Sequence, residues 1–140
     1  MTPTRAGATT VARLLAAAGL ALDAWVHAAL AGRYDAITAT LSQGTLFRVE
    51  AALAALAALL VLVLRRPGAD AFAFAVAAGG LALLLFYTYV HPGRLGPVPD
   101  MYDPRWFGDK KLAALGQAVT VLATVPLLAT RERADRRHRR

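Results

Sequence analysis

Four stretches of the chain consist almost entirely of apolar residues, and short polar links separate them. The stretches run from about Val11 to Ala31, Leu46 to Leu64, Ala69 to Val90 and Leu112 to Ala129. A helix needs roughly 20 apolar residues to cross a hydrocarbon core of about 30 Å. Backbone groups in lipid must bond within their own segment, so each stretch is expected to be a helix. We therefore predict one all-α domain over residues 1–140, a membrane-embedded four-helix antiparallel bundle.

The links contain residues that end helices. Arg65 and Arg66 precede Pro67-Gly68, a tight stop that predicts an antiparallel hairpin of the second and third stretches. Residues 91–109 hold four prolines and three glycines, so they cannot form one continuous helix. Pro126 lies inside the fourth stretch and predicts a kink in its last turns.

Composition agrees with a bilayer as the solvent and excludes several chemistries. Of the 140 residues, 57% are hydrophobic and 18% are charged, whereas soluble domains carry roughly a quarter of charged residues. The absence of cysteine excludes disulfides, thiolate metal sites, iron–sulfur clusters, covalent c-type haem and CxxC thiol redox chemistry. No P-loop, HExxH, GxSxG or GxGxxG motif is present, so we favour a protein without catalytic residues.

The distribution of lysine and arginine predicts how the chain is oriented. The N-terminus, the 65–66 link and the tail over residues 130–140 together hold ten basic residues. The other two loops and their flanks hold six basic residues, balanced by six acidic ones, so the net charge of +7 lies on the first face. By the positive-inside rule, both termini are expected in the cytoplasm. The bias toward alanine and arginine, with only two lysines, favours a bacterial inner (cytoplasmic) membrane.

The basic tail and the end of the first stretch each allow a second interpretation. A run of arginines can bind nucleic acid, but beside a membrane span it is more simply an anchor on anionic lipid headgroups, so no nucleic-acid partner is predicted. Ala29-Leu30-Ala31 has the form of a signal-peptide cleavage site. Asp23, Trp25 and His27 interrupt the preceding segment, which favours a retained span.

Ionisable and polar side chains gather toward the predicted outer half of the bundle, where they are costly and thus candidates for function. Asp23 and His27 stand at i and i+4, on one helical face. Tyr87 and His91 form a second such pair. Glu50 lies at a shallow depth in the second stretch, and the fourth stretch carries a polar stripe of Lys110, Gln117, Thr120 and Thr124. The inner halves are expected to carry almost no polar groups.

Three interpretations of this constellation compete. In the first, Asp23, Glu50, Arg48 and Lys110 neutralise one another and only fix the helix register. In the second, the pocket binds a ligand: a divalent metal on Asp23, His27, Glu50 and His91, a b-type haem between the two histidines, or a quinone headgroup. In the third, the carboxylates carry protons in a small transporter. Gly79, Gly80 and Gly116 are expected only to permit close helix packing.

A few residues suggest a relationship. The segments Asp23-Ala-Trp-Val-His27 and Tyr34-Asp35, followed by residues 101–107 (MYDPRWF) and Lys110-Lys111, resemble small four-helix membrane proteins of actinobacteria with a DoxX-like layout. That resemblance implies an accessory membrane subunit associated with quinone-linked or redox-stress functions, and it transfers no catalytic residue.

We therefore expect a small integral membrane protein, a non-catalytic or accessory and redox-associated component with a polar pocket in its outer half. The alternative is a haem-, metal- or quinone-binding membrane protein, or a small proton-coupled transporter. The cofactor is unknown. The expected partners are the lipid bilayer and another membrane protein or a second copy of the chain.

Overall fold

The structure, a computed structural model, describes residues 3–140 and is all-α, as predicted. Four long helices follow one another along the chain: α1 (Pro3–Ala31), α2 (Gln43–Val63), α3 (Pro67–Tyr89) and α4 (Gly108–His138). A short 3₁₀ turn, η1 (Gly32–Tyr34), ends α1. Within the described range no strand forms, and residues 90–107 are an extended, turn-rich loop, as their prolines predict.

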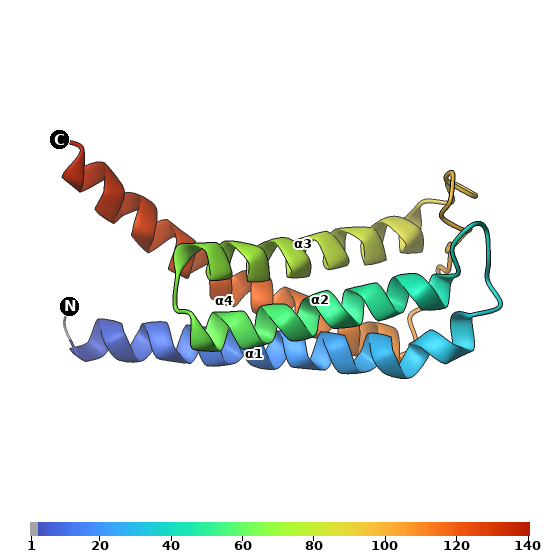
Figure 1. The fold of residues 1–140 in the computed structure, drawn as a ribbon, viewed down its shortest axis with the longest axis horizontal. Coiled ribbons are helices and arrows are strands. Elements are labelled where there is room, and N and C mark those ends of the chain that lie inside the picture. The colour runs from blue at the N-terminus through green and yellow to red at the C-terminus, as the bar shows by residue number, and fades with distance from the viewer. Residues whose placement is uncertain (1–2) are drawn as a thin grey trace.

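The helices run up and down in an antiparallel bundle. Helix α1 packs mainly on α2 and α4, and α3 packs on α4 and α2. The two termini and the turn between α2 and α3 lie at one end, and the two longer loops lie at the other (Figure 1). This places the three basic segments together at the terminal end and the electrically balanced loops at the opposite end.

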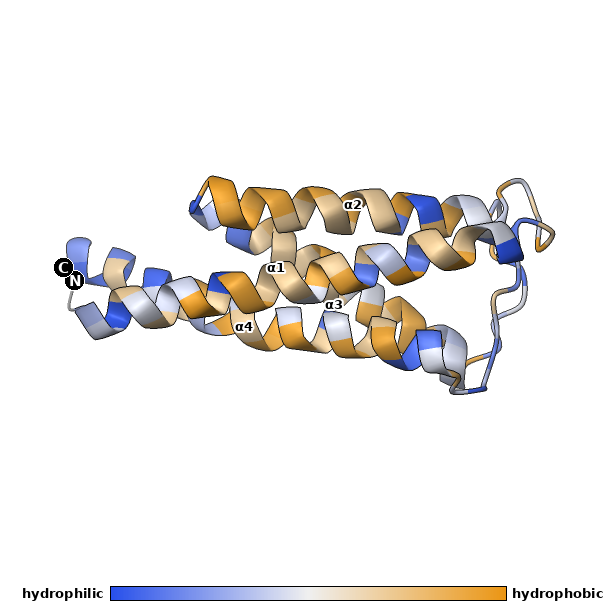
Figure 2. Cartoon of the chain, turned by 90° about the horizontal axis from the view of Figure 1, so that it is seen from below, coloured by the Kyte–Doolittle hydropathy of each residue, from blue (hydrophilic) through white to orange (hydrophobic). Residues whose placement is uncertain are grey.

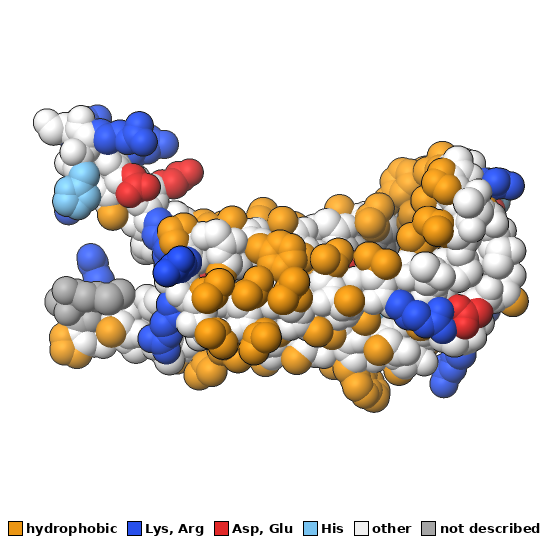
Figure 3. All heavy atoms as spheres, viewed as in Figure 1, with side chains coloured by type: hydrophobic (Ala, Val, Ile, Leu, Met, Phe, Trp, Pro, Cys, Tyr) orange, Lys and Arg blue, Asp and Glu red, His pale blue; other side chains and the backbone are white. Residues whose placement is uncertain are grey.

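All four helices are long and apolar enough to cross a membrane. Large apolar side chains remain exposed around the bundle, including Leu59, Leu83 and Leu122. Apolar residues cover the middle of the helices, and polar residues concentrate toward the two ends (Figure 2). The face seen in Figure 3 shows apolar side chains over the middle of the bundle and blue lysine or arginine side chains toward its ends. An exterior of this kind suits hydrocarbon as the surrounding solvent.

Small residues bring the helix backbones close together in the interior. One buried cluster consists largely of alanines from three helices, among them Ala17, Ala54 and Ala77. Where α1 crosses α4, Gly19 faces Gly116, and the position of a Gly116 Cβ lies only 2.6 Å from the Gly19 carbonyl oxygen. Thr120 donates a hydrogen bond of 3.0 Å to the Ala16 carbonyl across this crossing. The contact is thus backbone to backbone, the kind of approach that small residues permit between membrane helices.

Two details, the end of α4 and the surroundings of Gly79, differ from the sequence expectations, whereas the change of direction after Pro126 agrees with them. Helix α4 does not end near residue 129 but continues to His138, so most of the basic tail is helical. Pro126 lies inside α4, and beyond it the helix leads away from α1 (Figure 1). Gly80 and Gly116 are in close contacts as predicted, but the prediction for Gly79 is wrong, because open space surrounds the position of its Cβ.

The α1–α4 crossing yields a matched pair of variants. A methyl group at Gly19 meets the Gly116 carbonyl oxygen and lies 2.5 Å from Thr120 Oγ1. We expect Gly19→Ala to destabilise the bundle by about 1–3 kcal/mol, the usual result of overpacking. Gly79→Ala meets nothing, so helix propensity should leave it as stable as wild type or slightly more so. Thermal unfolding in detergent, followed by circular dichroism, compares the two, and equal melting temperatures would contradict the close crossing.

Candidate functional site

A buried dyad of Asp23 and His27 lies on the inner face of α1. The Asp23 side chain is fully buried, and its Oδ1 lies 2.9 Å from His27 Nδ1. The same nitrogen is 3.0 Å from the Asp23 carbonyl oxygen. Since both neighbours only accept, the Nδ1–H must donate, which directs the free Nε2 of His27 away from Asp23. Gln117 Nε2 on α4 donates a further bond of 3.0 Å to Asp23 Oδ1.

Glu50 on α2 brings a second carboxyl group to this dyad. Its side chain lies close enough to Asp23 and His27 to interact electrostatically with both. Helix α3 makes room for them at Gly80, where a Cβ would lie 2.7 Å from Glu50 Oε1 and 2.6 Å from Gln117 Nε2. All four helices thus converge on one polar cluster, which we call the outer cluster: Asp23, His27, Glu50 and Gln117, with Gly80 beside them.

The outer cluster contains more acceptors than donors. Within residues 3–140, three of its buried oxygens have no hydrogen-bond partner: Asp23 Oδ2, Glu50 Oε1 and Gln117 Oε1. A buried acceptor without a donor costs about 1–3 kcal/mol, and more when it is charged. An arrangement like this is stabilised by taking up a proton or by meeting the donor of a ligand.

His27 and Glu50 of the outer cluster form the polar end of a cavity of about 420 Å³. The wall is mostly apolar and comes from all four helices, and Val98, Met101 and Asp103 of the 90–107 loop line it as well. The Phe47 ring meets the His27 ring edge to face at 5.1 Å. Val49, Leu53 and Leu83 line the cavity and yet are 51%, 39% and 58% exposed. The cavity therefore opens sideways between α2 and α3, toward the surroundings of the bundle.

Most of the predicted site residues meet at this cavity. Asp23, His27, Glu50 and Gln117 form the outer cluster, and two of them, His27 and Glu50, line the cavity together with Tyr87 from α3 and Lys110 from α4. Lys110 Nζ donates a hydrogen bond of 2.5 Å to the Asp103 carbonyl oxygen and lies 5.4 Å from the centre of the Trp106 ring. It therefore ties the loop to α4 instead of neutralising Asp23 or Glu50.

His91 does not join them. It lies in the loop, bonded to Asp100 Oδ2 at 2.8 Å and stacked on Tyr102 at 4.5 Å. The His91 bond holds the pKa of the Asp100 carboxyl below its usual range. Across residues 3–140, no group of three or more His, Asp or Glu side chains is placed to hold a metal ion. The predicted metal set of Asp23, His27, Glu50 and His91 is thus not assembled, and the two histidines do not face each other as haem ligands would.

Arg48 also differs from its prediction. Its guanidinium forms a bidentate pair with Asp35 at 2.7 and 2.8 Å, outside the bundle and half exposed. This pair lowers the pKa of Asp35. The mutual neutralisation expected of Asp23, Glu50, Arg48 and Lys110 is therefore wrong, and the outer cluster contains no lysine or arginine.

A second polar cluster, which the sequence interpretation missed, lies at the terminal end of the bundle. Arg13 of α1 is 3% exposed and contacts both carboxylate oxygens of the fully buried Asp70, at 2.8 and 3.0 Å. It also donates to the Val61 carbonyl oxygen at 2.9 Å. From α4, Arg131 reaches Asp70 at 3.2 Å and the Arg65 carbonyl oxygen at 3.2 Å. We call this group of Arg13, Asp70 and Arg131 the inner cluster.

The inner cluster corrects the expectation that the inner halves lack polar groups. Its signal was present in the sequence, since Arg13 and Asp70 both fall inside predicted apolar stretches and carry opposite charges. Both stand near the terminal end of their helices, so an antiparallel bundle brings them to one level.

Comparison with known proteins identifies no family for this chain. No protein-family model, curated protein or solved structure matches this chain.

From the inner cluster we expect that replacing one buried acid by its uncharged amide strongly destabilises the bundle. Asp70→Asn leaves the Arg13 charge buried without its partner and should lower the free energy of unfolding by about 3–5 kcal/mol. The double variant Arg13→Gln/Asp70→Asn should regain part of that loss, because the fully buried Arg13 charge is gone and the remaining Arg131 is partly exposed. Arg48→Gln, which breaks the exposed pair with Asp35, is the control and should cause no measurable change. Unfolding in mixed detergent micelles measures the free energy of unfolding of all three variants. If Asp70→Asn were as stable as wild type, the pairing of Arg13 with Asp70 would be refuted.

Proposed function

We propose that the chain is an integral membrane protein of the bacterial inner membrane, and that it holds a lipophilic ligand with a polar headgroup, of the quinone class. In this role it is a non-catalytic, redox-associated component. The observation that carries the proposal is the cavity of about 420 Å³, which joins an apolar side opening to the outer cluster. The ligand's tail would lie along the opening between α2 and α3, and its headgroup would meet His27 and Glu50.

The chemistry at the polar end suits a quinone or quinol headgroup. Its carbonyl or hydroxyl oxygens need donors or acceptors spaced around an apolar slot. The Tyr87 hydroxyl and a protonated Glu50 can donate, and the free Nε2 of His27 and the unpartnered Glu50 Oε1 can accept. Bound oxygens would satisfy acceptors and donors that the bundle itself leaves unpaired. The resemblance to DoxX-like proteins points in the same direction and stays a prediction.

The alternative hypotheses of a bound metal ion or a bound haem receive less support. Either needs His91 beside His27, whereas His91 bonds to Asp100 in the loop. A proton-coupled transporter would use the same two acids, yet the cavity beside the outer cluster opens sideways between α2 and α3, and the inner cluster closes the terminal end with ion pairs. Ligand binding is the function that the geometry favours.

The ligand site can be tested through tryptophan fluorescence. Trp25 is 62% exposed on α1, whereas Trp106 adjoins Lys110 at the cavity. In a Trp25→Phe background, a short-chain ubiquinone should quench Trp106 in a saturable manner. His27→Leu should raise the dissociation constant about tenfold, the effect of losing one good hydrogen bond. His91→Leu removes a histidine outside the cavity and should bind like the parent.

Two outcomes would contradict this site. Quenching that rises linearly with ubiquinone, without saturation, would show only partition into the detergent. Equal weakening by His27→Leu and His91→Leu would show that the loop, and not the outer cluster, governs the signal. Circular dichroism spectra of all variants confirm that each one is folded.

The proposed orientation has a separate test, because the chain has no cysteine. With both termini in the cytoplasm, the 90–107 loop faces outward and the 64–66 turn faces inward. A membrane-impermeant maleimide should label Leu95→Cys in intact spheroplasts, and Gly68→Cys only after lysis; both positions are exposed. The reverse pattern would place the outer cluster on the cytoplasmic side.

A further inference from the structure

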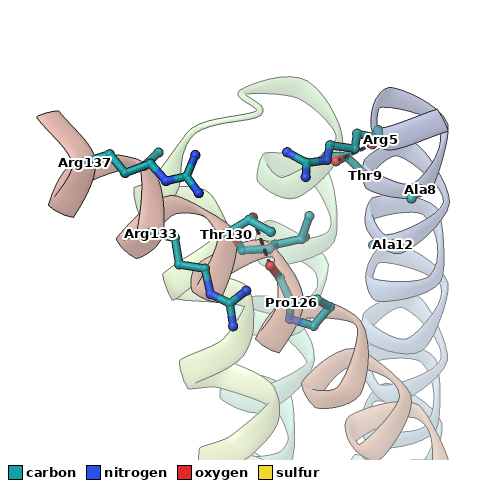
Figure 4. A pocket seen from close by; sticks show the side chains of 10 residues that line it. Arg5, Ala8, Thr9, Ala12, Pro126, Thr130, Arg133 and Arg137 are labelled. Atoms are coloured by element: carbon teal, nitrogen blue, oxygen red, sulfur yellow. Dashed lines mark hydrogen bonds between the residues drawn. The ribbon is translucent and has the colours of Figure 1, made fainter. Parts of the chain in front are cut away.

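A cleft of about 600 Å³ lies at the terminal end of the molecule, remote from the outer cluster. One wall is the N-terminal part of α1, and the other is α4 from Pro126 onward (Figure 4). Pro126 lacks a backbone N–H, so α4 loses one helical hydrogen bond there and can bend. Arg131 bonds Asp70 and the Arg65 carbonyl oxygen, which fixes the direction that α4 takes beyond the bend.

Three arginines line this cleft. Arg133 and Arg137 stand at i and i+4 on α4, hence on one face of the helix, and Arg5 lies across from them on α1. Figure 4 shows the side chains of Arg5 and Arg137 extending toward each other across the cleft. No ion pair or side-chain hydrogen bond between residues 3 and 140 uses any of these three guanidinium groups. Three formal positive charges thus converge on one space without a carboxylate to balance them.

The rest of the cleft is apolar. Ala8 and Ala12 of α1, with Pro126 and Leu127 of α4, line it on the side of the bundle. Exposed apolar residues continue from it along the helices, with Val11 56% and Val125 47% exposed. The cleft therefore changes from cationic near the chain ends to apolar near the bundle. A phospholipid has the same polarity, with an anionic phosphate followed by acyl chains.

We infer that this cleft is a discrete binding site for one anionic phospholipid. Its phosphate would be held by Arg5, Arg133 and Arg137, and the upper part of an acyl chain would lie against Ala8, Ala12 and Leu127. Arginine suits phosphate because its planar fork can donate two parallel hydrogen bonds. The inference rests on the membrane embedding proposed above, but not on the ligand of the outer cluster.

Native mass spectrometry of the detergent-purified protein tests the inference, with phosphatidylglycerol and phosphatidylcholine as probes. Wild type should bind one phosphatidylglycerol in preference to phosphatidylcholine. Arg5→Gln/Arg133→Gln/Arg137→Gln should weaken phosphatidylglycerol about tenfold or more, because each guanidinium near a lipid phosphate contributes. The matched control is Arg136→Gln/Arg139→Gln/Arg140→Gln, which removes the same number of charges, all from the tail, but spares the cleft. It should stay within about twofold of wild type.

Several outcomes of these binding measurements would refute the inference. Equal losses in the two triple variants would reduce it to a diffuse attraction of the tail, and no loss in the cleft triple variant would overturn it. Ala12→Phe retains every charge and fills the apolar part of the cleft, so it should also bind phosphatidylglycerol less tightly. If the cleft triple variant does not fold, the result for Ala12→Phe tests the inference in its place. Displacement of the lipid by millimolar inorganic phosphate would instead assign the cleft to a free anion. The interpretation of each of these outcomes is the same whichever way the chain crosses the membrane.

Discussion

The ion pair of Arg13 with Asp70 is the interaction on which the bundle depends most. Two opposite charges can lie in an apolar helix bundle only if each finds its partner there, since neither water nor lipid can solvate them. The pair joins α1 to α3, and it recruits α4 through Arg131 and the end of α2 through Val61. It thereby fixes the helices at the terminal end, and the small residues of the α1–α4 crossing then allow the backbones to approach.

The outer cluster meets the same constraint differently. It too gathers side chains from three helices, but its acids have no lysine or arginine, and only His27 and Gln117 donate to Asp23. Three buried oxygens remain without donors, beside a cavity that opens between α2 and α3. One end of the bundle is thus closed by complementary charges, whereas the other has unused hydrogen-bonding capacity facing an apolar slot. This contrast is the reason to look for function at the outer cluster.

Hydrophobic pattern and turn residues predicted the four helices, their order and the irregular 90–107 loop, because these depend on local spacing. They also brought Asp23, His27, Glu50 and Gln117 together, since i,i+4 spacing and antiparallel order determine face and depth. They failed where the outcome depends on competition between partners. Arg48 bonds to Asp35, His91 to Asp100 and Lys110 to the Asp103 carbonyl oxygen. The spacing of residues along the sequence does not determine which of several possible partners a side chain bonds to. Asp70 was overlooked because an acid in a first helical turn is ordinarily explained by the helix dipole.

We propose that the cavity beside the outer cluster holds a lipophilic ligand. Solvent extraction of the protein purified from its own membranes, followed by mass spectrometry and ultraviolet spectra of the extract, tests this proposal. We expect about one quinone-class molecule per chain. We expect a large decrease for Leu84→Trp, which narrows the cavity without removing a polar group. Equal amounts of quinone from wild type and Leu84→Trp, or none from either, would contradict the claim and leave the outer cluster a purely structural device.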